Sequence, residues 1–130
     1  MRVAPYCLIL LLSLVYAATA QAATLSDIYE RWYMLRAPET ERVRFEDGAH
    51  FLAHYPGWPE EKTIRLRTEA AAFAERPSAE AMEPFCTQLP PLSGRGMIAC
   101  ARAGVGQPSE RTGWIKQAWE QGDFSPEEEE

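Results

Sequence analysis

The sequence predicts an all-α fold in which short antiparallel helical hairpins form the start of an α-superhelix, or solenoid. Apolar residues recur at helical spacing, and no stretch alternates apolar and polar residues for long enough to indicate a strand. Proline or glycine interrupts the chain roughly every 15 to 20 residues, which keeps each helix short. Helices joined by so few residues pack as antiparallel hairpins, and a row of hairpins forms a solenoid. A compact six-helix bundle is the alternative.

Two helices are expected before residue 55. Thr24 and Asp27 resemble a capping box, and Pro38 ends the helix that they begin. The apolar residues at helical spacing in this first helix are Leu25, Ile28, Tyr29, Trp32 and Leu35. The second helix is expected over residues 40–54, and its inward-facing residues are Phe45, Ala49 and Leu52.

A turn separates the second helix from the third. Tyr55 and Trp58 are expected to pack in this joint. Pro59 suits the first position of a helix, and the helix then runs to about Ala74. Its expected inner face consists of Ile64, Thr68, Ala71 and Ala72.

Three more helices follow along the chain. Ser78 is the expected N-cap of the fourth helix, and Pro84 is expected to kink or end it. Its apolar stripe is Met82, Phe85, Cys86 and Leu89. Ser93 caps the fifth helix, whose inward residues include Met97 and Cys100. The sixth helix starts near Ser109 and ends at Gly122. One face of it carries Ile115, Ala118 and Trp119.

Residues 1–22 have the pattern of a cleaved secretory signal peptide. Arg2 provides a positive charge, an apolar run covers residues 6–18, and an A-x-A site lies at residues 18–20 or 20–22. The run is some 13 residues long, against the roughly 20 that a spanning helix needs. We therefore expect no membrane anchor, and Cys7 leaves with the signal.

The last residues of the chain carry the signals of a helix start. Ser125 is a good N-cap, Pro126 suits the first helical position, and Glu128 can close a capping box. Because no apolar helix follows, residues 23–130 are interpreted as a helical-repeat domain truncated at its C-terminus, with a solvated acidic tail as the alternative. A last hairpin without a neighbour would expose apolar surface around residues 114–124.

Charge and cysteine content limit the function classes. Without Arg2, the chain keeps 12 basic and 19 acidic side chains, a net charge of −7, and it has no basic stripe. Nucleic acid and anionic membrane surfaces are therefore not expected partners. Cys86 and Cys100 are candidates for a disulfide in an exported chain, and two buried thiols are an equal alternative.

Three segments resemble the N-terminal helical part of soluble lytic murein transglycosylases. Residues 51–59, FLAHYPGWP, are similar to the F-L-x-x-H/Y-P-x-W-P joint of that family. Residues 90–94, PPLSG, resemble its P-P-L-T/S-G turn, and residues 118–124, AWEQGDF, resemble its A-W-x-x-G-D-F helix end. The segments occur in the family's order and at similar separations, and the resemblance covers residues 24–130.

The resemblance implies a periplasmic protein of a Gram-negative bacterium with a U-shaped helical superhelix, a linker and a lysozyme-like C-terminal domain. Such enzymes cleave the glycan strand of peptidoglycan with a 1,6-anhydro product, using one glutamate in a Glu-Ser context. This chain has no Glu-Ser dipeptide and no lysozyme-like region. No catalytic, cofactor-binding or metal-binding residue is therefore carried over. The only indication that the chain belongs to an enzyme is its resemblance to this family.

Three interpretations of function follow. In the first, the chain is the non-catalytic superhelical part of such a transglycosylase, and it reaches peptidoglycan through the missing catalytic domain. In the second, it is a stand-alone exported helical-repeat adaptor that binds another periplasmic protein, because solenoids present concave binding surfaces. The third and least favoured is a small enzyme in its own right.

Two groups of residues are candidate binding sites. Glu46, His50 and His54 lie four residues apart and can share one helix face, a spacing that suits zinc. Phe51 follows His50 where a metalloprotease has its catalytic glutamate, so exposed helix histidines are the preferred interpretation. Among the tryptophans, Trp114 is the candidate ligand contact because it is expected to point outward and can stack on a sugar ring. The other three are expected in the core: Trp32, Trp58 and Trp119.

Overall fold

A computed structural model describes residues 23–37 and 42–122. Six α-helices make up 73% of these residues, which contain no strand, so the expected all-α fold of helical hairpins is confirmed. The helices are α2 (Leu25–Arg36), α3 (Phe45–His54), α4 (Glu61–Glu75), α5 (Ala79–Gln88), α6 (Gly94–Arg102) and α7 (Pro108–Gln121). The expected signal peptide and the helix-start signals at residues 125–130 lie outside the described residues.

The chain divides into two compact units, residues 1–30 and residues 31–130. In the described part of the first unit, Thr24 caps the start of α2. The Thr24 N–H and Oγ1 donate hydrogen bonds to Asp27 Oδ2 at 2.8 and 2.7 Å, and the Asp27 N–H donates to Thr24 Oγ1 at 3.2 Å. The capping box expected from the sequence is therefore present, and it satisfies N–H groups that the first turn leaves open.

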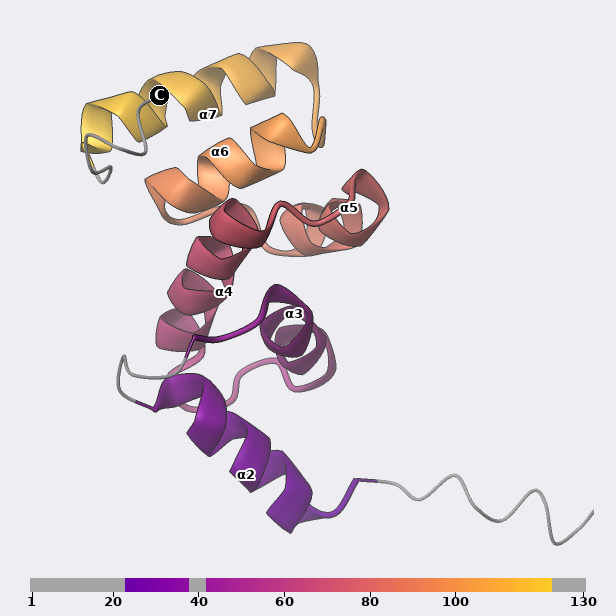
Figure 1. The fold of residues 1–130 in the computed structure, drawn as a ribbon. Coiled ribbons are helices and arrows are strands. Elements are labelled where there is room, and N and C mark those ends of the chain that lie inside the picture. Colours follow the sequence, from indigo (N-terminus) through magenta and orange to yellow (C-terminus); the bar gives the residue numbers. More distant parts are fainter. Residues whose placement is uncertain (1–22, 38–41, 123–130) are drawn as a thin grey trace, which may run out of the picture. The chain divides into compact units, whose positions relative to one another are not determined.

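In the second unit, two hairpins lie next to each other (Figure 1). α3 packs against α4, and α6 packs against α7. The hairpins meet through α4 and α6, while α5 packs against α6. Each hairpin therefore buries one of its helices against the other hairpin, which is how helical repeats form a shared core.

The core of the second unit is centred on α4. Every expected residue of its inner face is buried: Ile64, Thr68, Ala71 and Ala72. Phe51 on α3, at 2% exposure, and Met82 on α5, at 1%, are also in the core. The helical spacing of small and branched residues therefore predicts correctly which side of α4 is buried.

Two glycines allow α3 and α6 to approach α4 closely. A Cβ atom at Gly48 of α3 would lie 2.0 Å from Thr68 Oγ1, and one at Gly96 of α6 would lie 2.4 Å from Glu69 Oε2. Neither distance leaves room for a methyl group. Glycine is required at both positions because of this packing.

The start of the second predicted helix needs correction. α3 begins at Phe45, and residues 42–44, which were expected to be helical, are not. Ala49 is only half-buried, whereas Gly48 and Phe51 are buried. The helix is therefore rotated so that its glycine, rather than its alanine, faces α4.

The predicted face of α7 is also wrong in part. Ala118 is fully buried as expected, but Ile115 and Trp119 expose 42% and 53% of their surfaces. The covered stripe instead joins Ala118 to Trp114 and Arg111, which lie four and seven residues earlier and are half-buried. A helix turns 100° per residue, so Ile115 and Trp119 lie to one side of this stripe and face solvent. Over the described residues 114–122, their exposure agrees with the apolar surface expected there.

Among the described residues, no helix is both long and apolar enough to cross a membrane.

Candidate functional site

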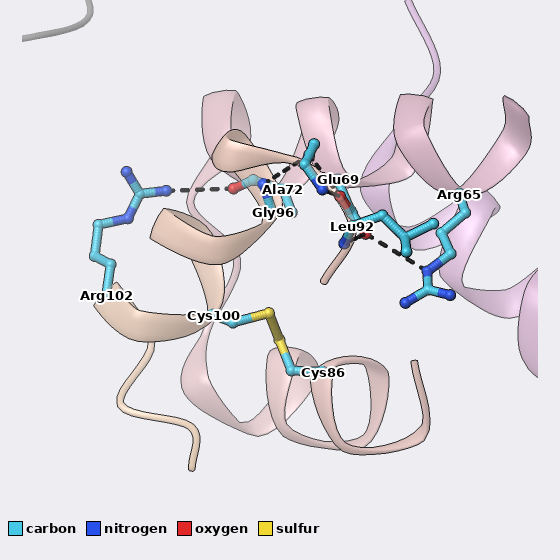
Figure 2. Close-up of a disulfide and its surroundings, with 9 residues drawn as sticks. Arg65, Glu69, Ala72, Cys86, Leu92, Gly96, Cys100 and Arg102 are labelled. Atoms are coloured by element: carbon cyan, nitrogen blue, oxygen red, sulfur yellow. Dashed lines mark hydrogen bonds and ion pairs between the residues drawn. A yellow bond between two sulfur atoms is a disulfide. The ribbon is translucent and has the colours of Figure 1, made fainter. Parts of the chain in front are cut away.

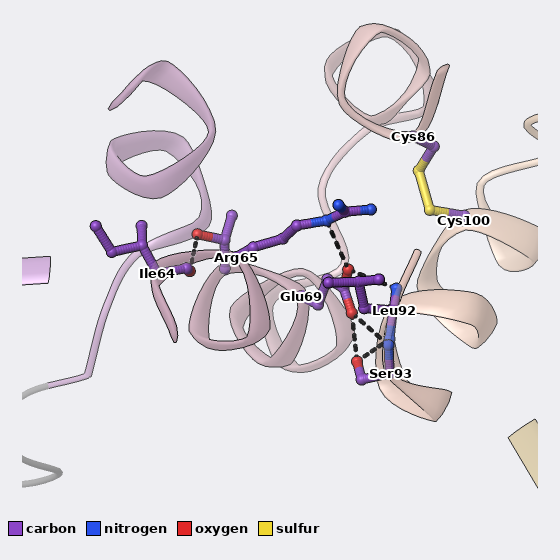
Figure 3. A network of polar contacts seen from close by, with 9 residues as sticks. Ile64, Arg65, Glu69, Cys86, Leu92, Ser93 and Cys100 are labelled. Atoms are coloured by element: carbon purple, nitrogen blue, oxygen red, sulfur yellow. Dashed lines mark hydrogen bonds and ion pairs between the residues drawn. A yellow bond between two sulfur atoms is a disulfide. The ribbon is translucent and has the colours of Figure 1, made fainter. Parts of the chain in front are cut away.

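The most highly organised polar cluster surrounds Glu69, which lies on the buried side of α4 (Figure 3). Its side chain is fully buried. Glu69 Oε1 accepts a hydrogen bond from the Leu92 N–H at 2.9 Å, and Oε2 accepts from the N–H and the Oγ of Ser93 at 2.8 and 2.5 Å. Arg65, one turn earlier, places its Nε 3.5 Å from Oε1.

The Glu69 cluster anchors the start of α6. Ser93 is the N-cap of that helix, and its Oγ accepts a hydrogen bond from the Gly96 N–H at 3.0 Å while donating to Glu69. The carboxylate therefore lies at the positive end of α6, where a negative charge is favourable. Its acceptor positions are filled by groups of this chain, so the arrangement holds two helices together and offers no free general base.

The second feature of this region is a disulfide between Cys86 on α5 and Cys100 on α6 (Figure 2). Both residues are buried, with Cα atoms 6.0 Å apart and an S–S distance of 2.08 Å. Of the two alternatives that the sequence left open, the structure has the disulfide and not a pair of free thiols. The bond joins α5 to α6.

Charged side chains also cover several helix ends. The Arg102 guanidinium donates hydrogen bonds to the carbonyls of Ala72 and Phe73 near the end of α4, at 3.3 and 2.8 Å. Partial burial, with a smaller effect of the neighbouring Arg76, lowers the pKa of Arg102 from its ordinary value. A guanidinium stays protonated in proteins, so Arg102 remains a cation at the negative end of α4.

The start of α3 has the opposite arrangement. Both carboxylate oxygens of Glu75, the last residue of α4, accept from the Phe45 N–H at 3.1 and 3.2 Å. A surface depression of about 420 Å³ lies beside this contact and includes Arg44 and Glu46, which form a 3.4 Å ion pair. The charged groups of the depression therefore already have partners within the chain.

The histidines of α3 do not form a metal site with Glu46. The rings of His50 and His54 stack with their centroids 4.0 Å apart, and His54 Nδ1 lies 2.8 Å from the carbonyl oxygen of His50. Within the described residues, no group of three or more His, Cys, Asp or Glu side chains is placed to hold a metal ion. Both histidines are exposed, in agreement with the simpler interpretation of their spacing.

None of the four tryptophans is fully buried. Trp58 contacts Phe51 and Tyr55 in the joint between α3 and α4, as expected, but Trp58 and Trp32 are half-buried and not in the core. Trp119 was expected in the core but is 53% exposed. Trp114, the candidate ligand contact, is half-buried rather than outward-pointing, because its ring lies against the backbone at Gly106. A sugar contact at Trp114 stays a prediction.

Two acidic residues at the start of α4 have partners within the chain. Glu60 forms a 2.7 Å ion pair with Arg36, and Glu61 accepts a hydrogen bond from the Gly57 N–H. Sequence reasoning missed Glu69, the one buried carboxylate among the described residues. The available signal was its position between Thr68 and Ala71 on the predicted inner face, where an acidic residue needs buried donors.

Comparison of the chain with family models, curated proteins and solved structures found no match.

Proposed function

We propose that this chain is the non-catalytic N-terminal superhelical part of a periplasmic soluble lytic murein transglycosylase. The proposal is supported by the three sequence segments that resemble the family and by the place of each segment in the fold. Each lies where a helix begins or ends, so each resemblance concerns residues that determine how successive helices are joined.

The first segment, residues 51–59, forms the joint between α3 and α4. Phe51 and Tyr55 pack on Trp58, with ring centroids 6.1 and 6.2 Å from it. The carbonyl of Pro59 accepts a hydrogen bond from the Trp32 Nε1–H at 2.7 Å. The aromatic and proline positions of the motif thus fix the turn between the two helices of a hairpin.

The turn at residues 90–94 carries the proposal furthest. The family pattern accepts either threonine or serine at the position of Ser93, and Ser93 is the N-cap of α6. Serine and threonine share the ability to accept a hydrogen bond from the first turn of a helix, so this alternation is what an N-cap requires. The Leu92 and Ser93 N–H groups of the same turn bind the buried Glu69.

The described part of the third segment, residues 118–122, ends α7. Gly122 adopts a positive φ of 64° as the C-cap, a conformation that glycine adopts without strain. Ala118 of this segment is buried, whereas Trp119 faces solvent.

In this proposal the chain shapes and positions a glycan-cleaving domain and contributes no catalytic group. Peptidoglycan is reached through that other domain, and the chain is exported to the periplasm by residues 1–22. The disulfide supports an oxidising compartment, because disulfides persist in secreted and periplasmic proteins and are rare in the cytosol.

Determining the reading frame beyond the codon for Glu130 tests the proposal. We expect an in-frame continuation that contains a Glu-Ser motif and a lysozyme-like region. The full product should release anhydro-muropeptides from purified sacculi, and the chain described here should release none. A stop codon at this point, together with a stable monodisperse product, would contradict the proposal and favour the exported adaptor.

Export has its own test. Residues 1–22 fused to alkaline phosphatase, which is active only after export, should give phosphatase activity in a Gram-negative host. The same fusion without residues 1–22 is the control and should be inactive.

A further inference from the structure

α5 differs from the other helices of the second unit in how it is held. Its inward side chains are Met82, Phe85 and Cys86, all buried. Phe85 packs edge-to-face on Phe45 of α3, with ring centroids 5.4 Å apart, and Cys86 is bonded to Cys100 of α6. The disulfide therefore joins a short helix, α5, to α6 (Figure 2).

The sequence of α5 makes it a weak helix. It has ten residues, and Pro84 lies inside it. Proline removes a backbone donor and crowds the preceding turn, and so short a helix is not stable without tertiary contacts. Its docking must come from the apolar contacts of its inner face and from the covalent bond.

Both ends of the α5 segment are fixed by contacts that do not involve α5. Before it, Arg102 binds the carbonyls of Ala72 and Phe73 at the end of α4. After it, Glu69 binds the N–H groups of Leu92 and Ser93. These contacts hold α4 to α6 without α5, and residues 76–91 form a connecting segment whose two ends are fixed.

We propose that α5 is a redox-latched strap. With the Cys86–Cys100 bond formed, α5 covers an apolar surface that includes Phe45 of α3. When an external dithiol reduces the bond, two electrons pass to the cysteine pair, each sulfur gains a proton, and the dithiol becomes a disulfide. The population of molecules in which α5 is undocked then rises, while the α3–α4 and α6–α7 hairpins stay folded.

The burial of the bond determines how reduction proceeds. Cys86 is 3% exposed and Cys100 is fully buried, so a thiolate reaches either sulfur only when the packing around the intact bond opens transiently. The rate of reduction thus reports this transient opening, and α5 undocks only after the bond is broken. This inference does not depend on the proposed transglycosylase function.

Amide hydrogen exchange on the purified chain tests the strap, with and without dithiothreitol. A disulfide that closes a loop of about 15 residues restricts the open state enough to change its population roughly a hundredfold. Exchange in residues 79–88 should therefore rise about a hundredfold on reduction, with α4, α6 and α7 unchanged within about threefold. The reduced wild-type chain keeps both sulfur side chains, so a packing defect cannot account for the result.

Two variants extend the test. C86A/C100A should show fast exchange in α5 without reductant and no further change with it. Pro84→Ala strengthens α5 and should slow reduction of the wild-type bond. Equal loss of protection in α6 and α7 would overturn the proposal, because the bond would then support the whole unit. Unchanged protection in α5 after reduction would also overturn it, because the Phe45–Phe85 contact would then suffice.

Discussion

Replacing Glu69 by glutamine should destabilise the protein more than any other single charge removal on α4. The carboxylate accepts hydrogen bonds from two backbone N–H groups and one hydroxyl, all on Leu92 and Ser93. A glutamine has one acceptor oxygen, and its NH₂ group would face one of these donors. An unpaired buried N–H costs about 1–3 kcal/mol, and the remaining bonds lose their charge assistance. We expect Glu69→Gln to lower the free energy of unfolding by about 2–4 kcal/mol.

The measurement is urea unfolding followed by far-UV circular dichroism. For a domain of this size the urea dependence is about 1–2 kcal/mol per molar, so the midpoint should fall by roughly 1–4 M. Glu120→Gln is the matched control, because Glu120 on α7 has a 65% exposed side chain and a long 3.8 Å pair with Lys116. That control should change stability by less than about 0.5 kcal/mol. If the two variants unfold at the same urea concentration, the Glu69 cluster does not hold α4 to α6.

The remaining substitutions test close packing and the exposed face of α7. Gly96→Ala should destabilise the protein by about 1–3 kcal/mol, because the added Cβ would lie 2.4 Å from the Glu69 carboxylate. Gly113→Ala is the control: a Cβ there has nothing within 4 Å, so this change should stabilise the helix by about 0.5–1 kcal/mol. Equal effects of the two changes in thermal unfolding would contradict the packing argument. Trp119→Ala should cost less than about 1 kcal/mol, and Trp114→Ala should cost more because its ring is half-buried. Trp114→Ala should also weaken retention on sedimented peptidoglycan, and unchanged retention would remove the proposed sugar contact.

The helices were predictable where their signals are local. Ser78 and Ser93 each precede a helix and accept a hydrogen bond from its first turn, from the Ala81 and Gly96 N–H groups. Such caps depend only on residues three positions apart. The same holds for the inner face of α4, whose spacing of apolar residues is regular enough to show which side is buried.

The Glu69 cluster was not predictable, because its partners lie 23 and 24 residues away along the chain. Only the packing of α4 against α6 brings Leu92 and Ser93 to the carboxylate. For α7 the difficulty was different. Ile115 and Trp119 are the more apolar pair, yet the smaller Ala118 is the residue that fits against α6. Which of two adjacent faces of α7 is buried depends on the shape of the neighbouring helix, and the hydropathy of the sequence gives no information on that shape.

The anchoring of residues 76–91 at both ends has a consequence for how related sequences can diverge. Since Arg102 and Glu69 already fix the two flanks, lengthening or shortening the segment between them leaves α4 and α6 in register. Connecting segments with fixed ends tolerate insertion at small entropic cost. Deletions and insertions should therefore accumulate on either side of α5, and not inside it, because there they would displace Met82, Phe85 and Cys86 from the core. The length from Leu92 to Gly96 should stay constant, because one added residue would displace the helix cap from its carboxylate.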